Sequence, residues 1–204
     1  MEVYSVLYRA YDFYNKKFFG NLLPKAVITL EYREGIKGYF SQGRFENQKN
    51  GMSISQITLN PLYLKKGEEM KFFATLVHEM VHFYVKLMGE KCSYGYHSKK
   101  WADEMENIGL IPTSTGKPGG KKLGFVMTQI IDQNGEYYKK TKELIKAGCV
   151  FDFVSLKEGN ESKTACEKAP QTRVRYKCEC SSFWGKEGLK VRCLNCNENF
   201  ISEV

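Results

Sequence analysis

The stretch GEEMKFFATLVHEMVHFYVKLMGE, residues 67–90, decides the fold. Its apolar residues recur at helical spacing around most of the helix circumference, which predicts a central, buried helix. Within this helix, His78 and His82 stand four positions apart, and Glu79 follows the first histidine directly. Residues four apart share one face of a helix, so the two imidazoles are expected to project side by side.

This histidine pair is a candidate zinc site. Two imidazoles on one helix face can both bind a zinc ion at about 2.0–2.1 Å. Glu79 is rotated off that pair, which suits a general base acting on a water that the metal activates. A catalytic zinc needs a third protein ligand and an open fourth position. The remaining one of the three histidines, His97, is the preferred third ligand, and Glu104 or Glu106 is the alternative.

The competing interpretation is a buried helix that carries HExxH by chance. A buried helix rarely holds two histidines and a glutamate without partners, because burying unpaired polar groups is costly. All three histidines of the chain also fall within residues 78–97. Both observations favour the metal site.

The elements around this helix predict an α+β domain. Helical periodicity predicts three further helices, over residues 4–18, 98–109 and 136–148. Alternating β-branched and aromatic residues predict four strands, over residues 25–32, 37–45, 52–60 and 125–132. The second and third of these strands should form a hairpin. Residues 111–124, rich in glycine, proline and lysine, are expected to be a loop.

A second metal motif lies near the C-terminus, in RYKCECSSFWGKEGLKVRCLNCNENF, residues 175–200. Four of the seven cysteines form two close pairs there: Cys178, Cys180, Cys193 and Cys196. Two thiolate pairs on two turns can enclose a tetrahedral structural zinc, which would supply most of the folding energy of so small a unit. We expect RYKC and KVRC to be matching strands that lead into the turns. Two disulfides are the alternative in an oxidising compartment.

Composition divides the chain and limits its partners. The pattern predicts a domain over residues 1–156, a polar linker over 157–171 and a small unit over 172–204. The net charge of +8 favours nucleic acid as a partner, although it also serves solubility. No apolar run reaches the roughly 20 residues of a membrane span, and the N-terminus lacks a signal-peptide pattern. We therefore expect a cytoplasmic protein without membrane association.

Several segments together resemble the SprT-like metalloprotease family, which includes the Spartan proteases that degrade proteins crosslinked to DNA. The matching segments are YDFYNKKFFGNLLPKAVITL (11–30), GYFSQGRF (38–45), ISQITLNP (54–61), TLVHEMVHFY (75–84), HSKKWADEMENIGL (97–110), TSTGKPGGKKLGFVM (113–127) and the cysteine tail. The resemblance implies a minimal zincin-like domain of helices packed on a small β-sheet, followed by a zinc ribbon. Ser98 departs from the family pattern, where a glycine is common.

The resemblance also implies the chemistry. His78, His82 and His97 would bind a catalytic zinc, with Glu79 as acid/base, and the four cysteines would bind a structural zinc, giving two Zn²⁺ per chain. The protein would be a zinc metalloendopeptidase that hydrolyses DNA-bound or DNA-crosslinked proteins, associated with the nucleoid in a bacterium. The alternative is a non-catalytic nucleic-acid-binding adaptor with structural zinc sites.

Basic residues are the candidate contacts to DNA, expected to be single-stranded or a single-strand/double-strand junction. They lie in two groups: Lys117, Lys121 and Lys122, continued by Lys139, Lys140, Lys142 and Lys146, and in the tail Arg173, Arg175, Lys190 and Arg192. Trp184, between the cysteine pairs, could stack on a base. Packing of Trp184 on the ribbon or on the first domain is the alternative.

Overall fold

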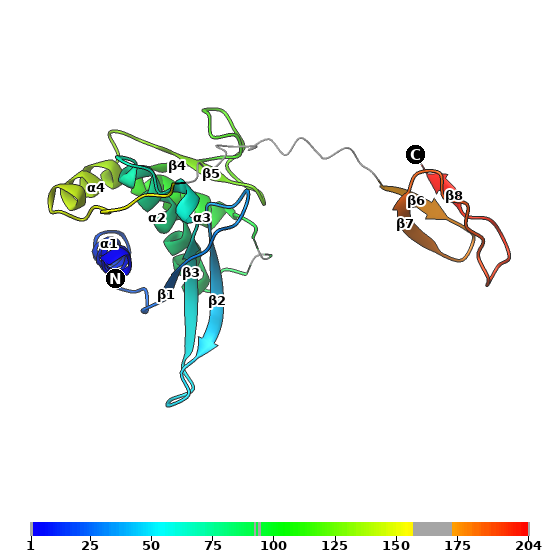
Figure 1. Ribbon diagram of the computed structural model, residues 1–204, viewed down its shortest axis with the longest axis horizontal. Helices are drawn as coiled ribbons and strands as arrows, with labels where there is room; N and C mark the ends of the chain where they lie inside the picture. Colours follow the sequence, from blue (N-terminus) through cyan, green and yellow to red (C-terminus); the bar gives the residue numbers. More distant parts are fainter. Residues whose placement is uncertain (1, 92, 94, 157–172, 204) are drawn as a thin grey trace. The chain divides into compact units, whose positions relative to one another are not determined.

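The computed structural model describes residues 2–91, 93, 95–156 and 173–203. The chain divides into two compact units, Met1–Thr164 and Ala165–Val204 (Figure 1). The predicted linker over 157–171 lies outside the described residues, so the predicted domain boundaries stay a prediction. The architecture is mixed α+β, as the sequence predicts.

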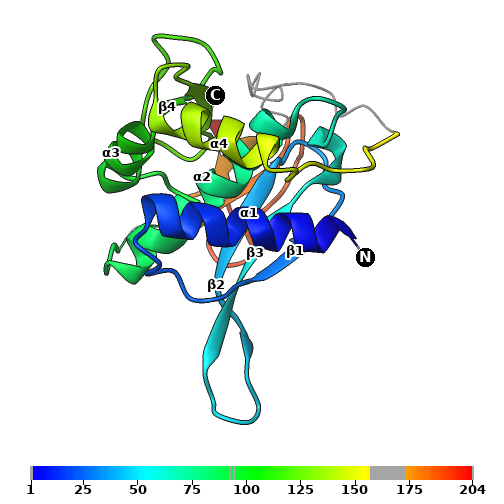
Figure 2. The same ribbon diagram turned by 90° about the vertical axis from the view of Figure 1, so that its left-hand side faces the viewer.

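A three-stranded sheet forms one layer of the first unit. β1 (Val27–Leu30) pairs in parallel with β3 (Ser53–Leu59), and β2 (Gly38–Glu46) pairs antiparallel with β3. The order β1-β3-β2 makes β2 an edge strand. The predicted hairpin of β2 and β3 is confirmed, and it extends well beyond the helices (Figure 2).

The helices are α1 (Glu2–Phe18), α2 (Glu69–Leu87), α3 (Lys99–Ile108) and α4 (Glu136–Lys146). A short 3₁₀ helix, Pro61–Tyr63, follows β3. As predicted, α2 is central and buried along most of its length, and it contacts the other three helices as well as β2 and β3. Aromatic side chains join these helices: the Tyr14 ring packs on Phe73 and Tyr137, and its hydroxyl lies 2.9 Å from Thr141 Oγ1.

Both ends of α3 follow from local sequence. The Ser98 hydroxyl accepts a hydrogen bond from Trp101 N at 3.2 Å, which caps the first turn. Gly109 ends the helix in the left-handed conformation, with φ of 92°. A Cβ at Gly109 would lie 2.9 Å from Gly135 Cα, so close packing also requires glycine there.

One prediction in the first unit is wrong in part. Residues 111–124 were expected to be a loop, but β4 (Leu110–Thr113) pairs antiparallel with β5 (Thr128–Ile131). Leu110 and Thr113 are buried, and Pro112 is accommodated opposite Gln129. The pairing partner lies across a long connection, so local composition does not reveal the strand.

The second unit is a three-stranded sheet of order β7-β6-β8, formed by β6 (Arg173–Lys177), β7 (Ser182–Lys186) and β8 (Ile201–Glu203). RYKC contributes to β6 as expected, but the prediction that KVRC is its matching strand is wrong. Residues 190–193 contribute only an isolated bridge, Arg192 to Asn199. β6 instead pairs with the aromatic segment directly after the first cysteine turn, which makes the shorter hairpin.

Within the described part of the chain, no helix is both long and apolar enough to cross a membrane.

Candidate metal centres and nucleic-acid interface

The three histidines converge in the first unit. α2 supplies His78 and His82 on one face, and His97 comes from the residue just before the α3 cap. One ring nitrogen of each histidine lies within 4.8 Å of the other two, and the Nε2 atoms of His78 and His97 are 3.1 Å apart. Glu106, one alternative ligand, instead pairs with Lys122 at 2.5 Å. The geometry therefore brings together the preferred ligand set.

Hydrogen bonds at Nδ1 orient the rings of His78 and His97. His97 Nδ1 lies 2.8 Å from the Gly124 carbonyl oxygen, which can only accept, so Nδ1 carries the proton. His78 Nδ1 likewise donates to Gln129 Oε1 at 3.0 Å. Each neutral imidazole then presents an Nε2 lone pair toward the other. Two lone pairs 3.1 Å apart repel unless a cation lies beside both, so this donor set fits a zinc ion.

Burial favours the same protonation state. It lowers the pKa of His78 to about 3, assisted by repulsion from His97, and it lowers the pKa values of His82 and His97 as well. The imidazoles are therefore neutral near pH 7, as metal ligands must be. The indole of Trp101 packs on all three, with ring centroids 4.8, 5.3 and 4.4 Å from His78, His82 and His97.

Glu79 is buried beside this cluster, with 5% of its surface exposed. Burial raises the pKa of its carboxyl to about 8. The first residue of β2, Gly38, passes very close to it: a Cβ there would lie 3.3 Å from Glu79 Oε1 and 2.9 Å from the Thr58 carbonyl oxygen. The sequence pattern predicts no role in the site for Gly38. The structure shows that β2 can approach the carboxylate this closely because residue 38 has no side chain.

A cleft of about 1040 Å³ exposes the cluster to solvent. The edge strand β2 lines one part of it, and residues 125–129 line another; His78, Glu79, His82 and His97 all face it. Among the described residues that line it, the cations are Arg33, Lys37, Arg44 and Lys86, and the carboxylates are Glu34 and Glu79. The arrangement can hold a metal ion and a general base beside an electropositive groove.

The four cysteines of the second unit also converge. Their sulfurs lie within 4.8 Å of one another, with Cys178–Cys180 at 3.8 Å and Cys180–Cys193 at 3.4 Å. These separations are those of thiols, because a disulfide bond measures about 2.05 Å. Backbone N–H groups of Cys196 and Asn195 lower the pKa of Cys193. A lower pKa favours the thiolate form of Cys193, the form that binds a metal. The four converging sulfurs are consistent with a zinc ribbon.

The strand register of the second unit gathers basic residues around Trp184. Arg175 lies directly opposite Trp184, Arg173 opposite Lys186, and Lys177 opposite Ser182, so these residues share one face of the sheet. Trp184 is 58% exposed, while Tyr176 on the other face is buried. More than half of the Trp184 side chain is therefore open to solvent within the ribbon. Two predicted contacts, Lys190 and Arg192, come after β7 and lie outside the three strands.

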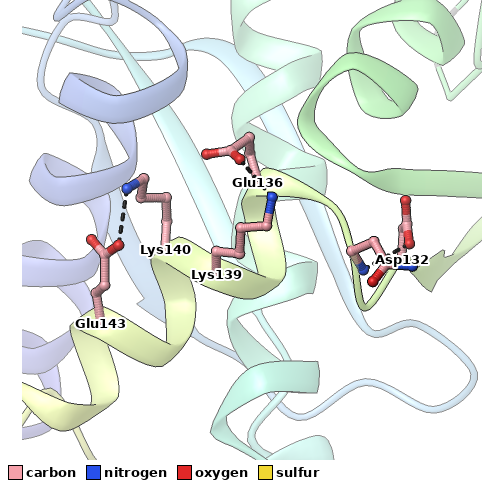
Figure 3. Close-up of polar contacts among 6 residues, drawn as sticks. Asp132, Glu136, Lys139, Lys140 and Glu143 are labelled. Atoms are coloured by element: carbon pink, nitrogen blue, oxygen red, sulfur yellow. Dashed lines mark hydrogen bonds and ion pairs between the residues drawn. The ribbon is translucent and has the colours of Figure 1, made fainter.

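Several lysines of the first unit have acidic partners. On α4, Lys139 pairs with Glu136 at 3.1 Å and Lys140 with Glu143 at 2.9 Å (Figure 3). Lys122 pairs with Glu106, as described above. Lys117 and Lys121 belong to the loop after β4, where the Thr113 hydroxyl donates to the Lys117 carbonyl oxygen at 2.8 Å. The positive charge of this group is thus partly neutralised within the unit.

The fold and the three-histidine centre define a metallopeptidase-like α+β protein. The family model described as SprT-like matches residues 7–118, more than half of the chain, so this chain belongs to the SprT-like family. A Salmonella typhimurium protein described as an uncharacterized protein in the mucB 3' region is 43% identical over 56 residues, which are 28% of this chain and 76% of that protein. The resemblance stated from the sequence is confirmed.

Proposed function

We propose that this protein is a zinc metalloendopeptidase that cleaves proteins bound or crosslinked to DNA, with one catalytic and one structural zinc per chain. The observation that carries the proposal is the convergence of His78, His82 and His97 with a buried glutamate in one open cleft. Membership of a metallopeptidase-like family supports the same chemistry.

His78, His82 and His97 would hold the catalytic metal. A zinc ion bound there would lower the pKa of a water molecule and polarise the carbonyl of the bond to be cleaved. Glu79 takes the proton from the attacking water and returns it to the departing amine. Its position beside the three histidines, facing the same cleft, places the carboxyl where it can reach both the attacking water and the departing amine.

The edge strand β2 positions the substrate in this proposal. It pairs with β3 along one side and borders the cleft with the other. An extended peptide can add to such an edge through main-chain hydrogen bonds, which give affinity with little dependence on sequence. This mode suits a protease whose substrates share attachment to DNA rather than a sequence motif.

The face of the β6–β7 sheet supports DNA as the partner. Arg173, Arg175, Lys177 and Lys186 can neutralise phosphates around an exposed indole, the combination used for single-stranded nucleic acid. A single strand, alone or at a junction with a duplex, offers the unpaired bases that Trp184 requires. Lys117 and Lys121 of the first unit would add phosphate contacts.

The test uses the full-length, zinc-loaded protein with a protein substrate crosslinked to single-stranded DNA, and the same substrate without DNA. We expect cleavage that a chelator and His82→Ala abolish, and that is faster on the DNA-bound substrate. DNA binding without any metal-dependent cleavage would contradict the protease and favour the adaptor.

Paired variants test the DNA-binding face. Trp184→Ala should weaken binding to single-stranded DNA by about tenfold, since stacking is worth ~1–3 kcal/mol per base. The matched control is Leu194→Ala, which removes another exposed apolar side chain of the same unit, 94% exposed and outside the strands. Lys186→Glu should weaken binding and flatten its salt dependence more than Lys190→Glu does. Equal effects within both pairs would contradict this face as the DNA site.

A further inference from the structure

We propose that Gln129 is a positioning residue of the histidine centre: its side-chain carbonyl fixes the tautomer and orientation of His78, and thereby sets the affinity of the site for its metal. The inference rests on the proposed function in one respect, that the three histidines bind a metal. It adds a residue that lies beyond the 7–118 segment matched by the family model.

The contact joins distant parts of the chain. Gln129 lies on β5, 51 residues after His78, and its Oε1 is 3.0 Å from His78 Nδ1. Pairing of β5 with β4 places it, since Gln129 stands opposite Pro112 in the register. The His78 ring also packs against Trp101, with centroids 4.8 Å apart and an angle of 62° between the ring planes. The ring is thus held by an indole and, at Nδ1, by an amide.

The tautomer matters because of the short distance between two ligand nitrogens. His78 Nε2 and His97 Nε2 are 3.1 Å apart, a hydrogen-bonding distance if either nitrogen carries a proton. Such a bond between histidines would occupy the lone pairs that a metal needs. An acceptor at Nδ1 keeps the single proton of each neutral imidazole on the outer side. Gln129 does this for His78, and the Gly124 carbonyl does it for His97.

The two outer acceptors belong to one short segment, residues 124–129, and residues 125–129 of it line the cleft. The Gly124 acceptor is a main-chain carbonyl, which substitution leaves in place. Gln129 acts through its side chain, so a substitution at position 129 can remove the hydrogen bond to His78 without changing any of the three histidines. It is half-buried and lies outside the hydrophobic core, so its replacement should leave the fold intact.

The experiment measures metal affinity directly, with Co²⁺ as probe and Zn²⁺ as competitor on the full-length, metal-stripped protein. The histidine site is followed by the visible absorption of Co²⁺ bound to nitrogen, and the cysteine site by thiolate-to-cobalt charge transfer. Gln129→Met keeps the length of the side chain and removes the amide acceptor. We expect it to weaken metal binding at the histidine site by about 10–100-fold, the usual effect of losing such a partner, and to leave the cysteine site unchanged.

Two variants complete the test. Gln129→Glu presents an acceptor in either orientation and should bind the metal at least as tightly as the wild type. Ile130→Ala perturbs the adjacent position of β5, opposite Ile111, without removing the hydrogen bond, and should bind like the wild type. Thermal unfolding of the metal-free proteins checks the fold; if Gln129→Met is unfolded, Gln129→Asn, which is one methylene too short, takes its place.

The outcomes separate the inference from the proposed function. Wild-type affinity in Gln129→Met, or an equal loss in Ile130→Ala, overturns the role of Gln129. A wild-type protein whose histidine site binds no Co²⁺, judged by comparison with His82→Ala, overturns the metal site itself and with it the proposed function.

Discussion

Gly38→Ala is expected to damage both the stability and the activity of this protein. The added Cβ would lie 2.9 Å from the Thr58 carbonyl oxygen, 3.0 Å from Thr75 Cγ2 and 3.3 Å from Glu79 Oε1. The first of these atoms belongs to the main chain of β3, which is paired with β2 and cannot move away alone. Something must therefore shift, and inserting a methyl group into a packed site costs about 1–3 kcal/mol.

Of the three groups in contact with the added Cβ, the Glu79 carboxylate can move most easily, because it lies at the end of a long side chain. The contact of 3.3 Å requires Glu79 to shift by a few tenths of an ångström, and a displacement near 1 Å of a reacting group can cost about 10²-fold in rate. We therefore expect peptide cleavage by Gly38→Ala to fall by about 3–30-fold. The melting temperature should fall by about 2–12 °C, at about 2–4 °C for each kcal/mol in a chain of this size.

The control separates these two effects. Leu144→Ala truncates a buried residue of α4 and should cost about 2–5 kcal/mol without moving Glu79. The assay is cleavage of an unstructured peptide by zinc-loaded protein, well below both melting temperatures. If Gly38→Ala cleaves like the wild type, or loses no more activity than Leu144→Ala, the close approach of β2 to Glu79 has no catalytic consequence.

Three further predictions concern the two candidate metal centres and the glutamate beside the first. Elemental analysis should find two zinc ions per chain, one lost in His82→Ala and the other lost or loosened in Cys193→Ser; a single zinc that survives His82→Ala contradicts the histidine site. Glu79→Gln should keep its zinc and its melting temperature while cleavage falls by about 10²–10⁴-fold, the usual contribution of a positioned acid/base; unchanged cleavage rules out that role. In the metal-free protein, burial raises the pKa of Glu79 from 4.5 to about 8, so the folded state holds this proton more tightly than the unfolded state does. The resulting stabilisation of the folded state is full below pH 4.5 and is lost as the pH rises through 8. Between pH 7 and 9 the wild type should lose about 1.4 kcal/mol more unfolding free energy than Glu79→Gln, as measured by chemical denaturation. Equal losses in the two proteins would show that the carboxyl is not held protonated.

The parts of this fold that the sequence predicts are those encoded by neighbouring residues. The buried helix α2 follows from apolar periodicity, and both ends of α3 follow from Ser98 and Gly109, whose cap geometry is local. The convergence of His78, His82 and His97 is also within reach of sequence, because two ligands share one helix face and the third begins the next helix.

The parts that sequence reasoning missed depend on strand pairing. β4 is a short segment with a proline, and it is a strand because β5 lies beside it. In the second unit, both SFWGK (182–186) and KVRC (190–193) could pair with β6, and the hairpin with the shorter connection forms. The β-strand propensity of a segment does not decide which of two segments forms the strand. The stability of a strand comes from contacts with its pairing partner, and the local sequence does not identify that partner.

The residues that orient the metal ligands belong to this second class. Gln129 reaches His78 because β5 pairs with β4, and Gly38 meets Glu79 because β2 pairs with β3. Gly124 reaches His97 through an isolated antiparallel bridge between these two residues. HExxH and a downstream histidine therefore specify which atoms can bind a metal, while the sheet contacts specify whether those atoms are held in the binding tautomer and at the binding distance. A chain with the same ligands but no acceptor at position 129 should retain the motif and bind its metal more weakly. The strength of such a site is thus encoded in the β4–β5 hairpin as much as in the helix that carries the motif.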